Sequence, residues 1–171
     1  MAKLFLTDRL SDEALKSVVD RFNPEMDICS LRAHLLMRRV LTDFDGNIET
    51  FFSQFDLSIG RYTLMFLLEE APAGMMPSEL AHKVGVTQAT ISGLINSLEK
   101  AQLVVRETHE KDGRAFVIKL TEKGHASVNS IAPDYYRRVN KFWVQFQPEE
   151  RKQLIALMER MITAIPVLGV K

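Results

Sequence analysis

The chain of 171 residues is 46% hydrophobic and 26% charged, a composition typical of one soluble globular domain or of one subunit of an interlaced dimer. Lysine plus arginine and aspartate plus glutamate both number 22, so binding to nucleic acid would need segregated rather than overall positive charge. A single cysteine excludes an internal disulfide, and no apolar run approaches the ~20 residues needed to span a bilayer. We therefore expect a cytoplasmic protein without a signal peptide or a membrane partner.

Two apolar-striped helices are predicted in the N-terminal third of the chain. Ser11 can cap the first helix, which ends before Pro24. Asp27 opens a longer helix whose apolar residues step by threes and fours as far as Phe55. We expect a kink or a break in this helix at the Asp-Gly-Asn run of residues 45–47, because glycine disfavours a helix interior. The first ten residues are expected to be a loose start.

A helix-turn-helix is predicted in the middle of the chain. After a helix capped by Ser58, Pro77 stands at the first position of a short helix that Gly85 ends. Thr87 can cap a second short helix. Two short helices joined by a tight turn that contains glycine are typical of the helix-turn-helix. The second helix has its apolar residues at helical spacing, at Ile91, Leu94, Ile95 and Leu98.

The opposite face of this second helix is small and polar. Such a face lets a helix sit deep in a DNA major groove and offer hydrogen-bond donors and acceptors to base edges. We therefore predict that it is a recognition helix. Its candidate DNA-binding residues are Thr87, Gln88, Ala89, Thr90, Ser92, Gly93 and Asn96.

A β-hairpin is predicted directly after the recognition helix. Val104–Thr108 and Ala115–Leu120 are rich in β-forming residues, and the Asp-Gly pair at 112–113 is a hairpin-turn signal. A hairpin in this place is a wing, and Lys111 and Arg114 at its tip suit contact with phosphates or with a minor groove. The combination is more specific than a bare helix-turn-helix, which any αα-hairpin can imitate.

The segment LVVRETHEKDGRAFVIKLTEKG resembles the MarR-type regulators, the family of multiple antibiotic resistance repressors. Arg106, the pair Asp112 and Arg114, and the closing Leu-Thr-Glu-Lys-Gly run stand where that family has them. The resemblance covers roughly residues 30 to 165. It implies that Arg114 enters the minor groove with Asp112 steadying it, while the stretch Thr87–Asn96 reads the major groove.

The resemblance also implies a fold that is mainly α with a small β-hairpin. A winged helix-turn-helix DNA-binding domain at residues 57–124 would be flanked by N-terminal helices at 1–56 and C-terminal helices at 125–171. The two flanking parts would form a dimerisation region. The expected protein is a homodimeric regulator, more often a repressor than an activator, and not an enzyme.

Four residues depart from the usual pattern of that family. Gly93 and Ser97 stand where basic residues are frequent on the recognition helix, and Gly113 replaces a frequent arginine in the wing. These departures lower the expected affinity for phosphates without changing the fold. Gln102 stands where a glycine usually ends the recognition helix, which predicts a left-handed conformation for a residue that is not glycine.

The C-terminal part is predicted to form two more apolar-striped helices, the first capped by Thr121 and the second opened by Pro148. Neither end of the chain can bury its apolar stripe alone. Pairing with the same region of a second subunit would cover both stripes, so a homodimer is expected.

An aromatic cluster around the helix capped by Ser58 has two interpretations. Its residues are spaced as core residues of helices, which is the simpler interpretation for most of them. By the family resemblance, the cluster would instead line a pocket for a small aromatic or lipophilic effector, with arginines to bind a carboxylate. The candidate pocket residues are Arg39, Phe52, Phe55, Arg61, Tyr62 and Phe66.

Other reactive residues support weaker hypotheses. Cys29 could make the chain a thiol-based redox sensor, although a buried, inert cysteine is commoner. His109 and His125 could converge beside Glu107 on a metal, but the spacing of the four histidines is not that of a metal site. No phosphate-binding loop, nucleophile elbow or carboxylate pair indicates an enzyme. We expect no catalytic residue, no metal and no cofactor.

Two functions from different classes stay open from the sequence alone. The first is a regulator that binds double-stranded DNA at a palindromic operator and responds to a small molecule. The second is a winged-helix module that binds protein, which the balanced charge of residues 57–124 favours. The thiol sensor is a variant of the first function that depends on Cys29.

Overall fold

The computed structural model describes residues 11–109 and 112–169, and of residues 109 and 112–115 it describes only the backbone. The expected loose start, residues 1–10, lies outside this range. The chain divides into two compact units, Met1–Leu64 and Met65–Lys171. The three-part division expected from the sequence stays a prediction. Within the described part of the chain, no helix combines the length and the apolar character needed to cross a membrane.

The N-terminal unit contains α1 (Asp12–Phe22), α2 (Ile28–Ser53) and the first part of α3 (Ile59–Glu69). The predicted starts of α1 and α2 are confirmed. The hydroxyl of Ser11 accepts a hydrogen bond from the N–H of Ala14 at 3.2 Å, and the carboxylate of Asp27 accepts one from the N–H of Ser30 at 2.8 Å. Such caps satisfy backbone groups that have no partner inside the helix.

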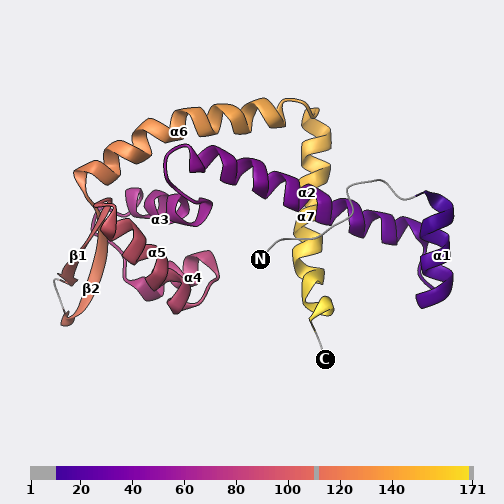
Figure 1. The fold of residues 1–171 in the computed structure, drawn as a ribbon, viewed down its shortest axis with the longest axis horizontal. Coiled ribbons are helices and arrows are strands. Elements are labelled where there is room, and N and C mark those ends of the chain that lie inside the picture. Colours follow the sequence, from indigo (N-terminus) through magenta and orange to yellow (C-terminus); the bar gives the residue numbers. More distant parts are fainter. Residues whose placement is uncertain (1–10, 110–111, 170–171) are drawn as a thin grey trace. The chain divides into compact units, whose positions relative to one another are not determined.

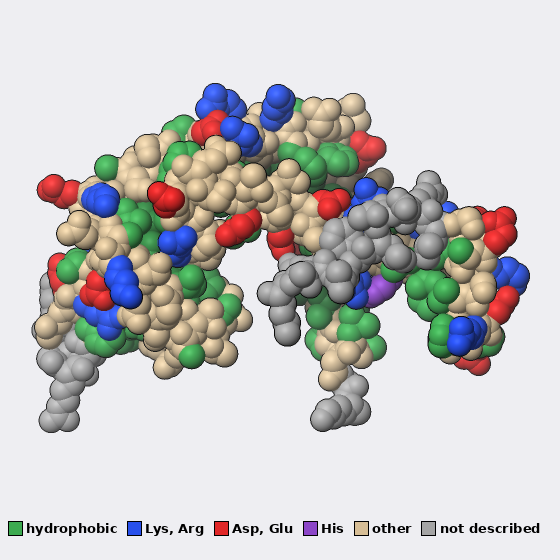
Figure 2. Space-filling view, viewed as in Figure 1, with side chains coloured by type: hydrophobic (Ala, Val, Ile, Leu, Met, Phe, Trp, Pro, Cys, Tyr) green, Lys and Arg blue, Asp and Glu red, His purple; other side chains and the backbone are tan. Residues whose placement is uncertain are grey.

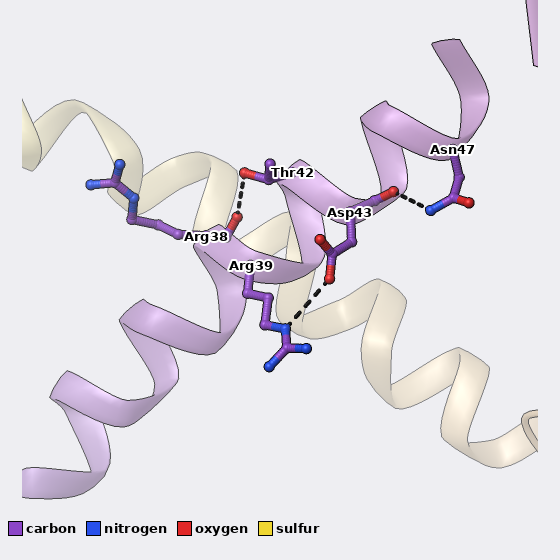
Figure 3. A network of polar contacts seen from close by, with 5 residues as sticks. All are labelled: Arg38, Arg39, Thr42, Asp43 and Asn47. Carbon is purple, nitrogen blue, oxygen red and sulfur yellow. Dashed lines mark hydrogen bonds and ion pairs between the residues drawn. The ribbon is translucent and has the colours of Figure 1, made fainter. Parts of the chain in front are cut away.

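The predicted break in α2 is wrong, because the helix runs without interruption through residues 45–47. Polar side chains near this stretch bond to carbonyls one turn earlier in the same helix. Thr42 donates to the carbonyl of Arg38 at 2.9 Å, and Asn47 donates to that of Asp43 at 2.7 Å (Figure 3). One interior glycine costs only about 1 kcal/mol relative to alanine, which is too little to interrupt a helix of 26 residues.

The C-terminal unit contains the end of α3, the winged helix-turn-helix and the helices that follow it (Figure 1). The fold expected from the sequence, mainly α with a small β-hairpin, is confirmed. The further elements are α4 (Pro77–Val84), α5 (Gln88–Lys100), β1 (Val104–His109), β2 (Asp112–Leu120), α6 (Glu122–Trp143), α7 (Pro148–Ala164) and the 3-10 helix η1 (Ile165–Leu168).

The helix-turn-helix forms as the sequence predicts. Gly85 ends α4 in the left-handed conformation, with φ of +67°, which glycine adopts without steric cost. Thr87 caps α5, and its hydroxyl accepts a hydrogen bond from the N–H of Thr90 at 3.2 Å. The apolar face of α5 is buried, at Ile91, Ile95 and Leu98.

The wing is a two-stranded antiparallel hairpin in which Val104 pairs with Leu120, and its register shifts after Thr108. Met75, just before α4, forms a bridge to the same hairpin. It exchanges two backbone hydrogen bonds with Ile118, at 2.8 and 3.0 Å. The segment that enters the helix-turn-helix is therefore tied directly to β2.

Buried apolar side chains from α3 to α6 make up the core of the C-terminal unit. Their burial explains why α5 turns only its polar face to solvent. In contrast, α7 has no buried residue. The core residues include Met65, Leu68, Leu80, Ile91, Ile95, Leu98, Val104, Ile118, Val128 and Ile131.

The start of α6 is bonded to the end of α5. Thr121 caps α6 by accepting a hydrogen bond from the N–H of Gly124 at 3.0 Å, and the same hydroxyl donates to the carbonyl of Gln102 at 2.8 Å. The ammonium group of Lys123 donates to the carbonyl of Ala101, also at 2.8 Å. The last two bonds satisfy carbonyls beyond the last turn of α5, where intrahelical partners run out.

Glycine at position 124 lets these two elements approach so closely. A Cβ atom there would lie 2.1 Å from the carbonyl oxygen of Leu103, a backbone atom that cannot move aside cheaply. Gly46, inside α2, has no atom within 4 Å of the equivalent Cβ position. Glycine is therefore required for steric reasons at position 124 but not at position 46.

We expect Gly124→Ala to lower the free energy of unfolding by about 3 kcal/mol, because the added methyl group forces α6 away from Leu103. Gly46→Ala is the matched control, and it should raise that free energy by about 1 kcal/mol because alanine is the better helix former. Urea unfolding followed by circular dichroism measures both. A Gly124→Ala variant as stable as the wild type would contradict the close approach.

Candidate nucleic-acid interface

The seven candidate residues of the recognition helix are all exposed. Their exposure follows from the amphipathic pattern, since the opposite face of α5 is buried. None carries a charge, and the small residues among them leave room for a partner to approach the helix backbone. The surface thus offers amide and hydroxyl groups, and it consists of Thr87, Gln88, Ala89, Thr90, Ser92, Gly93 and Asn96.

Two hydroxyl groups at the start of α5 are held together by the helix cap. The Oγ1 atoms of Thr87 and Thr90 lie 2.9 Å apart and share a hydrogen bond, in addition to the bond from the N–H of Thr90. The first turn of a helix also carries the positive end of its dipole, which favours an approach to phosphate. The cap therefore sets both the position of these hydroxyls and the local electrostatics.

The predictions for the wing tip stay predictions. Lys111 lies outside the described residues. Asp112 and Arg114 lie in β2, and only their backbone is described.

Arg106 connects the wing to the recognition helix, and the sequence did not predict this contact. Its Nη2 atom donates a hydrogen bond to Asn96 Oδ1 at 2.5 Å, and its Nε lies 3.2 Å from Glu99 Oε2. The guanidinium group also lies over the ring of Phe116, 5.2 Å from the ring centroid. The only sequence signal is the spacing of Asn96 and Glu99, which puts both on one side of α5.

Several basic residues of the winged domain make internal contacts. Lys119 pairs with Glu107 across the hairpin at 2.7 Å, and Arg106 pairs with Glu99. Lys123 donates to the end of α5, as described above. Hydrogen bonds and ion pairs inside the domain therefore engage part of the positive charge counted from the sequence.

The predicted effector-pocket aromatics divide between the two units. Phe52 and Tyr62 stack in the N-terminal unit with their ring centroids 4.4 Å apart, and both are buried. Phe55 lies beyond the end of α2 and is 39% exposed. Phe66 belongs to the C-terminal unit.

The two arginines of the predicted pocket make local contacts. The Nε atom of Arg39 lies 3.4 Å from a carboxylate oxygen of Asp43, one turn along α2 (Figure 3). The Nε atom of Arg61 donates to the hydroxyl of Ser58 at 3.4 Å. These contacts do not place either side chain in a cavity, so the pocket stays a prediction.

Cys29 is exposed in the first turn of α2, so the expectation of a buried cysteine is wrong. His125 contacts Glu69, with Nδ1 and Oε2 2.6 Å apart, and so joins α6 to the end of α3. The side chain of His109 lies outside the described residues. Among the side chains that are described, no three potential ligands come together in a way that could hold a metal ion.

The geometry of a helix-turn-helix followed by a wing agrees with comparisons to known sequences. The sequence profile of the MarR family matches residues 57–116. An uncharacterised helix-turn-helix transcriptional regulator of Bacillus cereus (strain ATCC 10987 / NRS 248) is 32% identical over 113 residues, which are 65% of this chain and 74% of that protein. The chain belongs to the MarR family.

Two further proteins extend the similarity over most of the chain. The helix-turn-helix transcriptional repressor YetL of Bacillus subtilis (strain 168) is 27% identical over 143 residues, which are 83% of this chain and 86% of YetL. The crystal structure of AbsC, a MarR family transcriptional regulator from Streptomyces coelicolor, has a TM-score of 0.69 and 25% identity, and covers 94% of this chain and 99% of AbsC. This MarR-family chain is a DNA-binding transcriptional regulator and not an enzyme.

Gln102 ends the recognition helix of this MarR-family chain in the left-handed conformation, with φ of +59°, as the sequence predicts. A side chain with a Cβ atom is strained there, whereas glycine is not. The strain is tolerated because the flanking backbone is fixed, with the carbonyl of Gln102 itself accepting from Thr121.

We expect Gln102→Gly to raise the free energy of unfolding by about 1 kcal/mol by removing this strain. Gln54→Gly is the matched control at the end of α2, where φ of −65° is right-handed helical, and it should lower stability by about 0.5–1 kcal/mol. Thermal unfolding of the two variants beside the wild type measures both. A change of the same sign in the free energy of unfolding of both variants would contradict strain at Gln102.

Proposed function

We propose that this MarR-family chain is a homodimeric repressor that binds a palindromic operator. The two α5 helices would enter successive major grooves roughly 10 bp apart, with the wings in the flanking minor grooves. The observation that supports this most directly is the exposed, uncharged polar face of α5 over a buried apolar face.

The polar face of α5 has the chemistry for reading base edges. Gln88 and Asn96 carry amides, which both donate and accept hydrogen bonds, while Thr90 and Ser92 carry hydroxyls. Small side chains let the helix sit close to the floor of a major groove. We propose as base-reading or groove-lining residues Thr87, Gln88, Ala89, Thr90, Ser92, Gly93 and Asn96.

The wing supplies the proposed backbone contacts. Lys111 and Arg114 stand near the hairpin turn, where a cation can reach phosphates or the narrow minor groove. Asp112 would steady the guanidinium group of Arg114. These contacts would fix the position of α5 on DNA without reading sequence themselves.

The exposed apolar residues of the terminal helices support the homodimer. No residue of α7 is buried, and Phe22 at the end of α1 is 72% exposed. Figure 2 shows hydrophobic side chains at the surface of both helices. A second copy of the chain would cover such surfaces, whose exposure costs free energy in water. On α7 and η1 they comprise Ile155, Leu157, Met158, Met161, Ile162, Ile165, Val167 and Leu168.

The proposal includes an effector that weakens DNA binding. A small aromatic or lipophilic acid would bind near Phe52 and Tyr62, with Arg39 or Arg61 facing its carboxylate and with Phe55 as a further wall residue. It can act only by binding more tightly to a form of the dimer that does not fit DNA. Titration of the DNA complex with aromatic carboxylates tests this, and no release by any of them would contradict it.

The first test of the function is selection of bound fragments from the source genome by the purified protein, followed by salt titration. The affinity should fall steeply with salt, and Lys111→Ala or Arg114→Ala should each reduce the logarithmic slope by about 1. Lys152→Ala on α7 is the control, because it removes one exposed charge away from the proposed DNA surface. Failure to enrich any sequence at low salt would exclude the repressor and favour the protein-binding module.

The dimer is tested by the double substitution Ile155→Glu with Ile162→Glu, two exposed residues two turns apart on α7. Charges there should prevent apolar contact between subunits, so light scattering should give one chain mass of 19.5 kDa in place of twice that mass. The affinity for the operator should fall when the dimer is lost. Glu159→Gln on the same helix is the control and should stay dimeric. A wild-type protein that has the mass of one chain and still binds a palindromic operator would contradict the homodimer.

A further inference from the structure

The contact between Arg106 and Asn96 determines which atoms Asn96 can offer to DNA. A guanidinium group carries only hydrogen-bond donors, so the atom of the Asn96 side chain that it faces, 2.5 Å away, must be the carbonyl oxygen. The amide NH₂ group of Asn96 is then the part that is left to face a partner. An asparagine side chain that could otherwise turn either way is thus held in one orientation.

Arg106 is itself held in place from two other sides. Glu99, one turn beyond Asn96 on α5, binds its Nε atom at 3.2 Å, and the ring of Phe116 lies under the guanidinium plane. Arg106 lies in β1, and its three partners come from α5 and from β2. Arg106 therefore keeps the same relation to Asn96 only while the hairpin and the recognition helix keep their relative position.

The orientation of the amide matters because guanine and adenine differ at one atom of the major groove. Both purines present the acceptor N7, but guanine adds the acceptor O6 where adenine adds an N6 donor. An asparagine that can turn either way pairs with adenine by accepting from N6 and donating to N7. An asparagine whose oxygen is turned toward Arg106 presents its NH₂ group to the groove, and these donors suit N7 and O6 of guanine and oppose the amino group of adenine.

We propose that Arg106 is a positioning residue that makes Asn96 select guanine over adenine in the operator. The inference rests on the proposed function, in which Asn96 faces a base in the major groove. It assigns to Arg106 no contact with DNA. Its effect is therefore on the base preference at one position, rather than on affinity for every sequence.

The test uses the full-length protein and the operator selected from its genome. Fluorescence anisotropy measures the Kd for a set of operator variants in which each base pair is exchanged between G·C and A·T. The pair contacted by Asn96 is the one whose preference disappears in Asn96→Ala. At that pair the wild type should bind the guanine form about tenfold more tightly than the adenine form.

Arg106→Met keeps an apolar side chain over Phe116 but removes all donors. In this variant the amide can turn, so the guanine preference should vanish or change to adenine, with the preferences at other positions unchanged. Arg106→Lys restores a donor and should restore the guanine preference. Glu99→Gln, the control on α5, removes the charge of the ion pair but keeps an acceptor oxygen for the Nε atom of Arg106, which stays bonded to Asn96. The base preference of this variant should match that of the wild type.

The outcomes separate this inference from the proposed function. If Arg106→Met weakens binding to all variants equally, or lowers the salt slope, Arg106 is a phosphate or structural contact and the inference is wrong, while the repressor stands. The inference is also wrong if Asn96→Ala changes no preference, or if the wild type prefers adenine at that pair. A wild type that selects no sequence overturns the proposed function and this inference together.

Discussion

The contact between the start of α6 and the end of α5 is the constraint on which the recognition helix depends. Gly124 permits an approach to Leu103 that no other residue allows, and Thr121 and Lys123 then bind carbonyls that end α5. A helix end bonded in this way does not fray, because its last backbone groups have partners. The contact with α6 therefore fixes the C-terminal end of α5, while burial of the apolar face turns the polar face to solvent.

Apolar burial and polar contacts contribute to α5 in different ways. Each fully buried residue of its apolar face, such as Ile91 or Ile95, contributes about 1.5–3 kcal/mol to stability. The partly exposed pair of Arg106 and Glu99 contributes well under that, because solvent screens it. The apolar face therefore keeps the helix in the domain, while the weaker contacts of Arg106 set the direction of a single side chain. Stability and the proposed recognition of DNA are therefore largely separate properties of α5.

The sequence predicted those features that depend on neighbours a few residues away. Caps such as Ser11 and Thr87 act over three residues, and the exposed face of α5 follows from its period. The predicted break at residues 45–47 was wrong because the free-energy cost of one interior glycine is small beside the stability of the rest of α2. The hydrogen bond of Arg106 to Asn96 joins β1 to α5, and no pattern among neighbouring residues in the sequence predicts it. The effector pocket depends on such distant contacts throughout, which is why it stays a prediction.

The balanced charge of the chain has a consequence for how such a repressor would find its operator. Affinity for DNA of any sequence comes from phosphate contacts, and internal bonds engage Arg106, Lys119 and Lys123. Base contacts from the uncharged face of α5 need no cation at the DNA, and Arg106 would act on them only by orienting Asn96. The proposed repressor would therefore gain less affinity for bulk DNA than a strongly basic one, while it keeps its preference for the operator. Because phosphate contacts add to both affinities, weak phosphate binding lowers them together, and the base contacts alone set the preference for the operator.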